Sequence, residues 1–336
     1  MKKYLIVSII IIISVLIAVT YLFVEFSSKH AVPGGRILIT IPEGQNASEI
    51  GTILKENGLP VLPGMFSFAA LITGADKNLG SGTYELGPDF TIFGLLDTFK
   101  RGRGLSIQVR LLEGSTLKEV AGRLSSDLGL SASAIFDLAS DSTFVDSLLP
   151  GEKNLDGFLY PDTYLFPVNM TERKILRLLV KRFDRVFEDL VDNQDRGAGL
   201  SRSELVILAS IIEKEAKVPM ERKLISSVFH NRLRIGRPIE SCATIRHILD
   251  KPTRPLSYKD LSAESPYNTY LHSGLPPGPI CNPGRASLEA ALYPAEVEYL
   301  YFVAKGDGSH IFSKSLSEHN RAKREIKIRK PPLPDV

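Results

Sequence analysis

One acidic residue, Glu213, stands directly after a long apolar run at residues 205–212. The run has no glycine or proline and is long enough for a helix, which would place Val206, Ala209 and Ala216 on the same face as Glu213. A carboxyl group against that small, apolar face would lose hydration, and this loss favours its neutral form. We therefore predict that Glu213 serves as a general acid.

Glu213 has a simpler alternative role, in which it forms an ion pair with a nearby cation, Arg222 or Arg232. The neighbouring Glu215 is not expected to complete a catalytic pair, because two residues along a helix rotate a side chain by about 200°. Hydrolysis of a glycosidic bond normally uses two carboxylates. This helix therefore offers one acid without an obvious carboxylate partner.

Three segments near this helix in sequence are rich in aromatic, proline and amide residues: DGFLYPDTY (156–164), SPYNTY (265–270) and GLPPGPICNPG (274–284). Aromatic faces stack on sugar rings, and amide groups bind their hydroxyls, so these loops suit a carbohydrate ligand. The same residue types also form tight turns, which leaves a purely structural alternative open.

Helices are expected at residues 172–191, 202–216 and 221–235.

The N-terminal segment, residues 4–24, is apolar and carries no charge. At about 1.5 Å per residue it would span the roughly 30 Å of a bilayer core. Lys2 and Lys3 precede it and Glu25 follows, so the positive-inside tendency places the N-terminus in the cytoplasm and the body outside. A cleaved signal peptide is the alternative, but its apolar core would be shorter and would precede a small-x-small site.

Composition limits the other classes of function. Hydrophobic residues make up 43% and charged residues 24% of the chain, enough apolar material for a packed body. The net charge of +3 is too small to indicate nucleic-acid binding. The six histidines show no paired ligand spacing with carboxylates, so neither a metal nor a cofactor is expected. Cys242 and Cys281 would both lie in the exported body, where a disulfide can form.

A sequence pattern recurs near the N-terminal half of the body. ITIPEGQNASEI (39–50) matches VRLLEGSTLKEV (109–120) in residue type and order. Each copy reads as a short alternating strand, a Glu-Gly turn and a helix with apolar residues at helical spacing. The pattern predicts two strand-turn-helix modules, with chance similarity as the alternative.

Five further runs together resemble the endolytic murein transglycosylase (YceG-like) family: LASIIEKEA (208–216), VFHNRL (228–233), SPYNTY, GLPPGPICNPG and LYFVA (300–304) with EHN (318–320). The resemblance covers nearly the whole chain. It implies an α+β fold with an N-terminal transmembrane helix, small LysM-like strand-turn-helix modules and a catalytic domain of helices and a β-hairpin. The implied domains are a cytoplasmic tip (1–3), the transmembrane helix (4–24), a linker (25–35), a membrane-proximal α/β module (36–105), a LysM-like module (106–150) and the catalytic domain (151–336).

The resemblance also implies a bacterial inner-membrane lyase that cuts peptidoglycan glycan strands internally and leaves 1,6-anhydro ends, with Glu213 as its catalytic acid. One glutamate suffices in this chemistry because the C6 hydroxyl of the substrate attacks C1. Termination of nascent strands and partnership with penicillin-binding synthases are further implications. A non-catalytic, glycan-binding scaffold is the main alternative, and a lyase acting on a small molecule is another.

The expected substrate-binding residues come from the same motifs: Asn231, Arg232, Ser241, Thr244, Tyr267, Asn268, Thr269 and Tyr270. The chain departs from the family at two places. Cys242 stands where many members have aspartate, which puts a substrate role there in doubt and raises the question of a bond to Cys281. Asp156 stands where a glutamate is expected before Gly-Phe.

Overall fold

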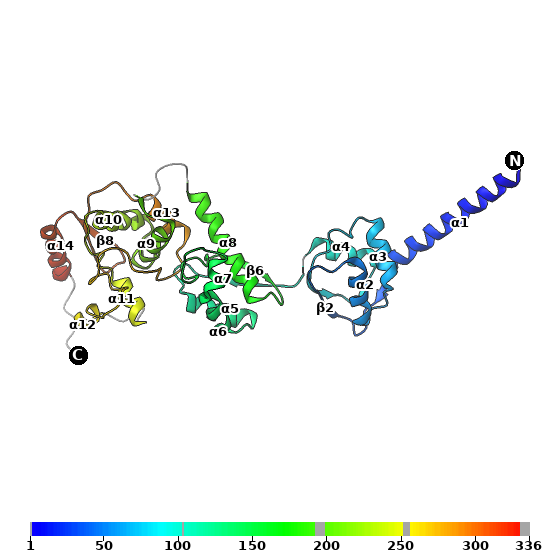
Figure 1. The fold of residues 1–336 in the computed structure, drawn as a ribbon, viewed down its shortest axis with the longest axis horizontal. Helices are drawn as coiled ribbons and strands as arrows, with labels where there is room; N and C mark the ends of the chain where they lie inside the picture. The colour runs from blue at the N-terminus through cyan, green and yellow to red at the C-terminus, as the bar shows by residue number, and fades with distance from the viewer. Residues whose placement is uncertain (1, 103, 192–198, 251–255, 330–336) are drawn as a thin grey trace. The chain divides into compact units, whose positions relative to one another are not determined.

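The computed structural model describes residues 2–102, 104–191, 199–250 and 256–329 (Figure 1). The chain divides into two compact units. Residues up to 108 and residues 165–170 form the first, and residues 109–164 and those from 171 onward form the second. The fold class is mixed α/β, as predicted, and in the described residues the strands pair only two by two.

The first unit contains the apolar N-terminal helix and a small α/β module. Its elements are α1 (Lys2–Ser27), β1 (His30–Ala31), β2 (Ile37–Ile41), α2 (Ala47–Glu56), α3 (Pro63–Ile72), β3 (Gly82–Leu86), β4 (Asp89–Phe90) and α4 (Ile92–Arg101). β1 pairs with β4 and β2 with β3, both antiparallel.

The N-terminal helix α1 combines an exposed apolar length with a buried end. Residues Tyr4–Ser27 are long and apolar enough to cross a membrane, which fits a single-pass anchor or a signal sequence. At the end of α1, Phe26 is fully buried and its ring lies 5.5 Å from that of Phe93. Val32 is buried too, so part of the expected linker 25–35 belongs to the core of this unit.

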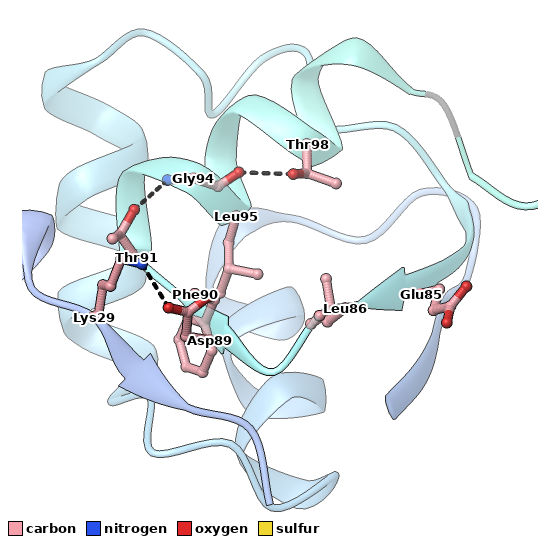
Figure 2. Close-up of a pocket in the computed structure, with 10 residues that line it drawn as sticks. Lys29, Glu85, Leu86, Asp89, Phe90, Thr91, Gly94, Leu95 and Thr98 are labelled. Atoms are coloured by element: carbon pink, nitrogen blue, oxygen red, sulfur yellow. Dashed lines mark hydrogen bonds and ion pairs between the residues drawn. The ribbon is translucent and has the colours of Figure 1, made fainter. Parts of the chain in front are cut away.

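A surface pocket of about 300 Å³ lies in the first unit, between the β3–β4 turn and α4 (Figure 2). Lys29 Nζ lies 2.7 Å from Asp89 Oδ2 at its wall, and both side chains are exposed. Exposed ion pairs of this kind contribute little to stability. The lining contains none of the predicted site residues.

The two copies of the repeat form the predicted strand-turn-helix arrangement. In the first copy β2 leads to α2, and in the second β5 (Ser106–Arg110) leads to α5 (Leu117–Leu128). Each helix begins with a capping box, from Asn46 and Thr116 respectively. Gly44 and Gly114 have positive φ angles of 84° and 77°, a conformation that favours glycine in the Glu-Gly turns. Their assignment as LysM-like modules stays a prediction.

The second unit is mainly helical. Its elements are α5, α6 (Ala132–Ser140), α7 (Ser142–Asp146), α8 (Glu172–Leu190), α9 (Arg202–Glu215), the 3₁₀ turn η2 (Pro219–Glu221), α10 (Arg222–Arg234), α11 (Cys242–Leu249), α12 (Tyr258–Leu261), α13 (Arg285–Leu292), β7 (Tyr301–Ala304), β8 (His310–Ser313) and α14 (Leu316–Arg329). β6 (Thr163–Pro167) pairs with β5, and the boundary between the units falls within both strands. β7 and β8 form an antiparallel pair.

Helix α9 is the centre of the second unit. The residues from Leu205 to Ile212 are all buried, as expected for a helix that is apolar on every side. α10, α11 and α13 pack against it, and a capping box at Ser201 and Glu204 fixes where it begins. The predicted helices at 172–191, 202–216 and 221–235 are confirmed as α8, α9 and α10. The buried helix thus holds Glu213 at its last turn.

Candidate active site

Glu213 lies in the last turn of α9 with its side chain only 8% exposed. Its Oε2 accepts a hydrogen bond from the backbone N–H of Gly284 at 3.0 Å. Gly284 is the N-cap residue of α13 (Arg285–Leu292), so the carboxylate joins the ends of two packed helices. The apolar face predicted for Glu213 is present, because Val206, Ala209 and Ala216 are all buried.

Arg222, the first residue of α10, forms an ion pair with Glu213. Its Nη2 lies 3.6 Å from Glu213 Oε1, and its Nε donates to Ser287 Oγ at 3.2 Å. The guanidinium is therefore held by α13 while it faces the carboxylate. The predicted ion-pair alternative is confirmed for Arg222. For Arg232 it is wrong, because that guanidinium is bound to other groups.

A second carboxylate, that of Glu113, lies beside Glu213, and the sequence reasoning missed it. A Cβ atom on Gly284 would overlap the Glu113 carboxylate, and one on Gly114 would lie 3.6 Å from Glu213 Cγ. Both glutamates therefore converge on Gly284. Burial raises the pKa of Glu113, the charge of Glu213 raises it further, and Arg222 lowers it. The expectation that Glu213 has no carboxylate neighbour is thus corrected.

Asn282 fixes the Glu113 turn in place. The N–H of Gly114 donates to Asn282 O at 2.8 Å, and the N–H of Asn282 donates to Ser115 O at 2.8 Å. The Asn282 side chain donates to Ser115 O at 2.9 Å and accepts from the N–H of Leu159 at 2.8 Å. Through these bonds Asn282 connects the Glu-Gly turn, the aromatic loop and its own proline-rich loop. Its buried polar groups are thereby all hydrogen-bonded.

Glu215 faces other partners than Glu213 does, as the helix geometry predicted. Its Oε1 accepts hydrogen bonds from the Ser241 hydroxyl and from the N–H of Ala243, the latter at 3.2 Å. These donors belong to the first turn of α11. Glu215 therefore caps a neighbouring helix and is not the carboxylate that faces Glu213.

Three of the predicted substrate-binding residues form one buried polar network. The N–H of Ser241 donates to Thr269 Oγ1 at 3.0 Å, and the hydroxyls of Thr244 and Thr269 lie 3.0 Å apart. All three residues are at most 2% exposed. The Ser241 N–H and the two threonine hydroxyls hold α11 against the 265–270 loop, and a role in binding substrate stays a prediction.

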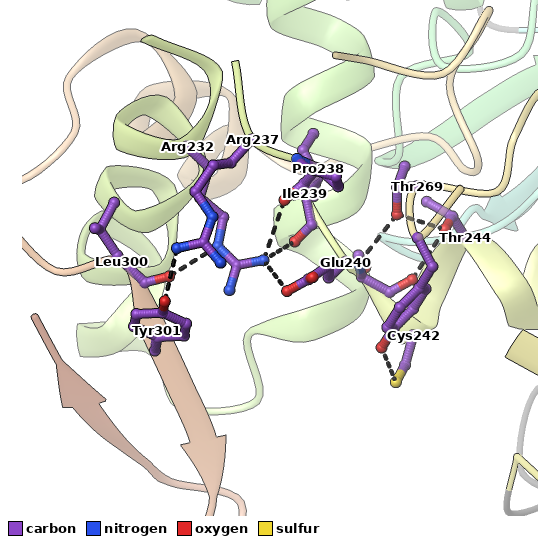
Figure 3. A network of polar contacts seen from close by, with 12 residues as sticks. Arg232, Arg237, Pro238, Ile239, Glu240, Cys242, Thr244, Thr269, Leu300 and Tyr301 are labelled. Atoms are coloured by element: carbon purple, nitrogen blue, oxygen red, sulfur yellow. Dashed lines mark hydrogen bonds and ion pairs between the residues drawn. The ribbon is translucent and has the colours of Figure 1, made fainter. Parts of the chain in front are cut away.

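Asn231 and Arg232 connect α10 to the strands and loops around it, and Figure 3 shows the contacts of Arg232. The Asn231 amide donates to Val297 O at 2.8 Å and Tyr299 O at 2.9 Å. Arg232, only 6% exposed, donates to Leu300 O at 2.7 Å, Ile239 O at 2.8 Å and Glu240 Oε2 at 2.7 Å. Because these donors are occupied by the protein, substrate contacts by either residue stay a prediction.

We expect Arg232→Lys to destabilise the chain by about 2 kcal/mol, because an ammonium cannot reproduce the planar fork of donors and leaves buried carbonyls unsatisfied. Denaturant unfolding measures the change. Arg234→Lys is the matched control on the same helix, since Arg234 is exposed and donates only to Asn231 Oδ1 in the described bonds. An Arg232→Lys variant as stable as wild type, with weaker substrate binding, would instead favour a direct role.

The remaining predicted binding residues, Tyr267, Asn268 and Tyr270, differ in exposure. Asn268 is fully buried and donates to Leu261 O at 2.9 Å and Ala263 O at 2.8 Å, so its amide holds the loop. Tyr267 and Tyr270 are half-buried, and burial raises the pKa of both hydroxyls. These two rings are the members of the set that keep surface for a ligand.

Cys242 and Cys281 are free thiols, so the disulfide raised as a question by the sequence is not formed. Cys281 is fully buried against α9, where its Sγ donates to Ser210 O at 3.3 Å. Cys242 is exposed on α11, and its Sγ lies 3.1 Å from the Tyr270 hydroxyl. The two side chains thus face the core and the surface respectively.

The described residues contain no cluster of three or more histidine, cysteine, aspartate or glutamate side chains that could hold a metal ion. His310 Nδ1 lies 2.6 Å from Glu221 Oε2, and His230 Nε2 lies 2.9 Å from Ala291 O. These two histidines make structural bonds.

Comparison with known proteins identifies the family of this chain. The sequence model of the YceG-like family matches residues 39–325. The chain belongs to the YceG-like family. The family resemblance that the motifs indicated is thereby confirmed, and the match includes Glu113, Glu213 and Gly284.

This YceG-like chain is similar to two named bacterial proteins and to one protein with a crystal structure. It is 33% identical over 303 residues to the endolytic murein transglycosylase of Bacillus subtilis strain 168, covering 85% of this chain and 84% of that protein. It is 29% identical over 317 residues to the protein of the same name from Streptococcus pneumoniae strain R6, of which it spans 57%. A crystal structure of a YceG-like protein from Listeria monocytogenes matches with a TM-score of 0.58 and 33% identity, over 86% of this chain and 99% of that one.

Proposed function

We propose that this chain is an endolytic transglycosylase of peptidoglycan, a lyase that cleaves β-1,4 bonds within glycan strands and leaves 1,6-anhydro-N-acetylmuramic acid ends. The observation that carries the proposal is the placement of Glu213, nearly buried at the end of α9 and oriented by Gly284 and Arg222. The names of the relatives from Bacillus subtilis and Streptococcus pneumoniae support the substrate class.

Glu213 performs both proton transfers in this mechanism. It first donates its proton to the bridging oxygen as the bond from that oxygen to C1 of N-acetylmuramic acid breaks. The C6 hydroxyl of the same sugar then bonds to C1, and its proton passes to the Glu213 carboxylate. The carboxyl group is restored, and no water enters the product.

The N-terminal helix α1 determines where the enzyme acts. α1 anchors the chain in the inner membrane, with Lys2 and Lys3 on the cytoplasmic side and the body facing the wall. An anchored enzyme meets strands as membrane-bound synthases, the penicillin-binding proteins, extend them. We propose that cleavage there ends strand elongation.

Digestion of purified peptidoglycan by the full-length chain in detergent tests the function, with products identified by mass. We expect fragments with anhydro ends, which are lighter by one water than hydrolytic products. Reducing ends would overturn the lyase mechanism and indicate a hydrolase that uses Glu113 as second carboxylate. Absence of products, with retained binding to the glycan, would favour the scaffold alternative.

A further inference from the structure

Glu113 occupies the active site without a structural partner that explains it. It is only partly exposed at the tip of the turn after β5, and its carboxylate occupies the place that a Cβ on Gly284 would take. In the described part of the chain this carboxylate makes no hydrogen bond or ion pair, whereas the carboxylate of Glu119, further along the same segment, forms part of the capping box of α5. A structural reason for its position is thus lacking.

The backbone around Glu113 holds it where it is. Asn282 binds the turn on both sides through Gly114 and Ser115, at 2.8 Å each. Gly114 takes a left-handed conformation there, and α5 begins two residues after Ser115 with its own cap. The turn is therefore preorganised, and its carboxylate faces the same glycine as Glu213.

The direct contacts of Glu213 do not favour a general acid by themselves. An N–H donor and a guanidinium both stabilise a negatively charged carboxylate, and Gly284 and Arg222 supply one of each. A general acid must instead carry its proton when substrate arrives. A neighbouring negative charge supplies the opposing effect, since two close carboxylates retain one proton between them.

We propose that Glu113 is a positioning residue of the active site, whose negative charge beside Gly284 keeps the catalytic proton on Glu213 until the leaving oxygen takes it. This inference rests on the function proposed above. The Glu113 and Glu213 side chains meet at Gly284, and the charge of Glu213 raises the pKa of Glu113 after the larger effect of burial, so the two carboxyl groups are close enough to interact. Two cations of the described residues also face the pair: Arg222, with Nη2 3.6 Å from Glu213 Oε1, and Lys214, whose Nζ would lie 3.8 Å from a Cβ on Gly114, and both limit the coupling.

The pH dependence of kcat/KM tests the proposal, measured with the full-length chain between about pH 4.5 and 9 as the rate of anhydro-end formation. We expect Glu113→Gln to move the alkaline limb to lower pH by about one pH unit, which corresponds to about a tenfold loss above the limb and recovery below it. Glu113→Asp keeps the charge and should retain the wild-type limb. An unchanged limb in Glu113→Gln, or a uniform loss at every pH, would overturn the proposal.

Two further variants sharpen the result. Gly284→Ala keeps the N–H bound to Glu213 but displaces the Glu113 carboxylate, so the limb should move as it does in Glu113→Gln. Glu43→Gln is the matched control, because Glu43 has the same place in the other Glu-Gly turn but belongs to the first unit. Wild-type enzyme without anhydro products would refute the proposed function itself, whereas active wild type with superimposed profiles would refute only the role of Glu113.

Discussion

Replacement of Glu213 by glutamine is expected to lower the rate of glycan cleavage by about 10² to 10⁴-fold, the range that a positioned acid and base contributes. Glutamine retains an oxygen that can accept the Gly284 N–H and has nearly the same volume, so the fold should persist. Arg222 keeps its bond to Ser287. Release of anhydro-ended fragments, quantified by mass, measures the rate, and thermal unfolding checks the fold.

Glu215→Gln is the matched control for this experiment. It removes the same charge two residues further along α9, and its amide oxygen can still accept from Ser241 and Ala243. Activity close to that of wild type is expected. Comparable losses in Glu215→Gln and Glu213→Gln would mean that charge at the end of α9, and not the acid beside Gly284, controls the reaction.

The local features of this fold could be read from the sequence because they depend on local chemistry. The apolar run before Glu213 and the cap residues at Ser201 and Glu204 were sufficient to place α9. Helical rotation alone separated Glu213 from Glu215, and the structure gives them different partners. Hydrophobic period and capping are set by neighbours a few residues away, so one chain suffices to see them.

Glu113 could not be assigned to the site from the sequence because its position depends on distant contacts. The repeat identified its turn correctly, but nothing local indicates that the turn docks on Asn282 and Gly284. A signal was present in retrospect. An acidic residue precedes the glycine in both copies of the repeat, although the turn itself requires only the glycine.

The predicted substrate-binding residues show a different limit. Polar side chains such as those of Asn231, Thr244 and Asn268 bind sugars and backbone carbonyls through the same donors. The structure places all three in the interior, where unsatisfied amides and hydroxyls would be costly, and supplies protein partners. Residue type therefore identified side chains that form hydrogen bonds. Whether they bond to the protein or to a ligand depends on their burial, which the sequence does not give.

Stability is expected to fall as pH rises from about 4 to about 7, because of Asp156 in the aromatic loop. Loss of hydration raises the pKa of this carboxyl from 3.8 to about 7, although the N–H groups of Gly157 and Leu117 and the charge of Lys214 lower it in part. The folded state therefore binds this proton more tightly than the unfolded chain. Its stabilising effect is complete below the unfolded pKa and is lost as pH rises through the folded one.

Asp156→Asn should remove this dependence, since an amide keeps an oxygen for the Gly157 N–H at 3.1 Å and has no charge to desolvate. At pH 8 the variant is expected to be more stable than wild type by on the order of 3 kcal/mol, and near pH 4 the two should be alike. Unfolding by urea at several pH values measures both differences.

Asp137→Asn, which removes an exposed charge from α6 of the same unit, is the control and should leave the wild-type profile unchanged. Parallel profiles for Asp156→Asn and wild type would contradict a desolvated carboxyl at this position. The location of Asp156 gives the result a functional meaning, because its Oδ1 lies 3.4 Å from the Asn282 amide that fixes the Glu113 turn. Ionisation of Asp156 therefore weakens the unit at the point where the aromatic loop, Asn282 and the two active-site glutamates are connected.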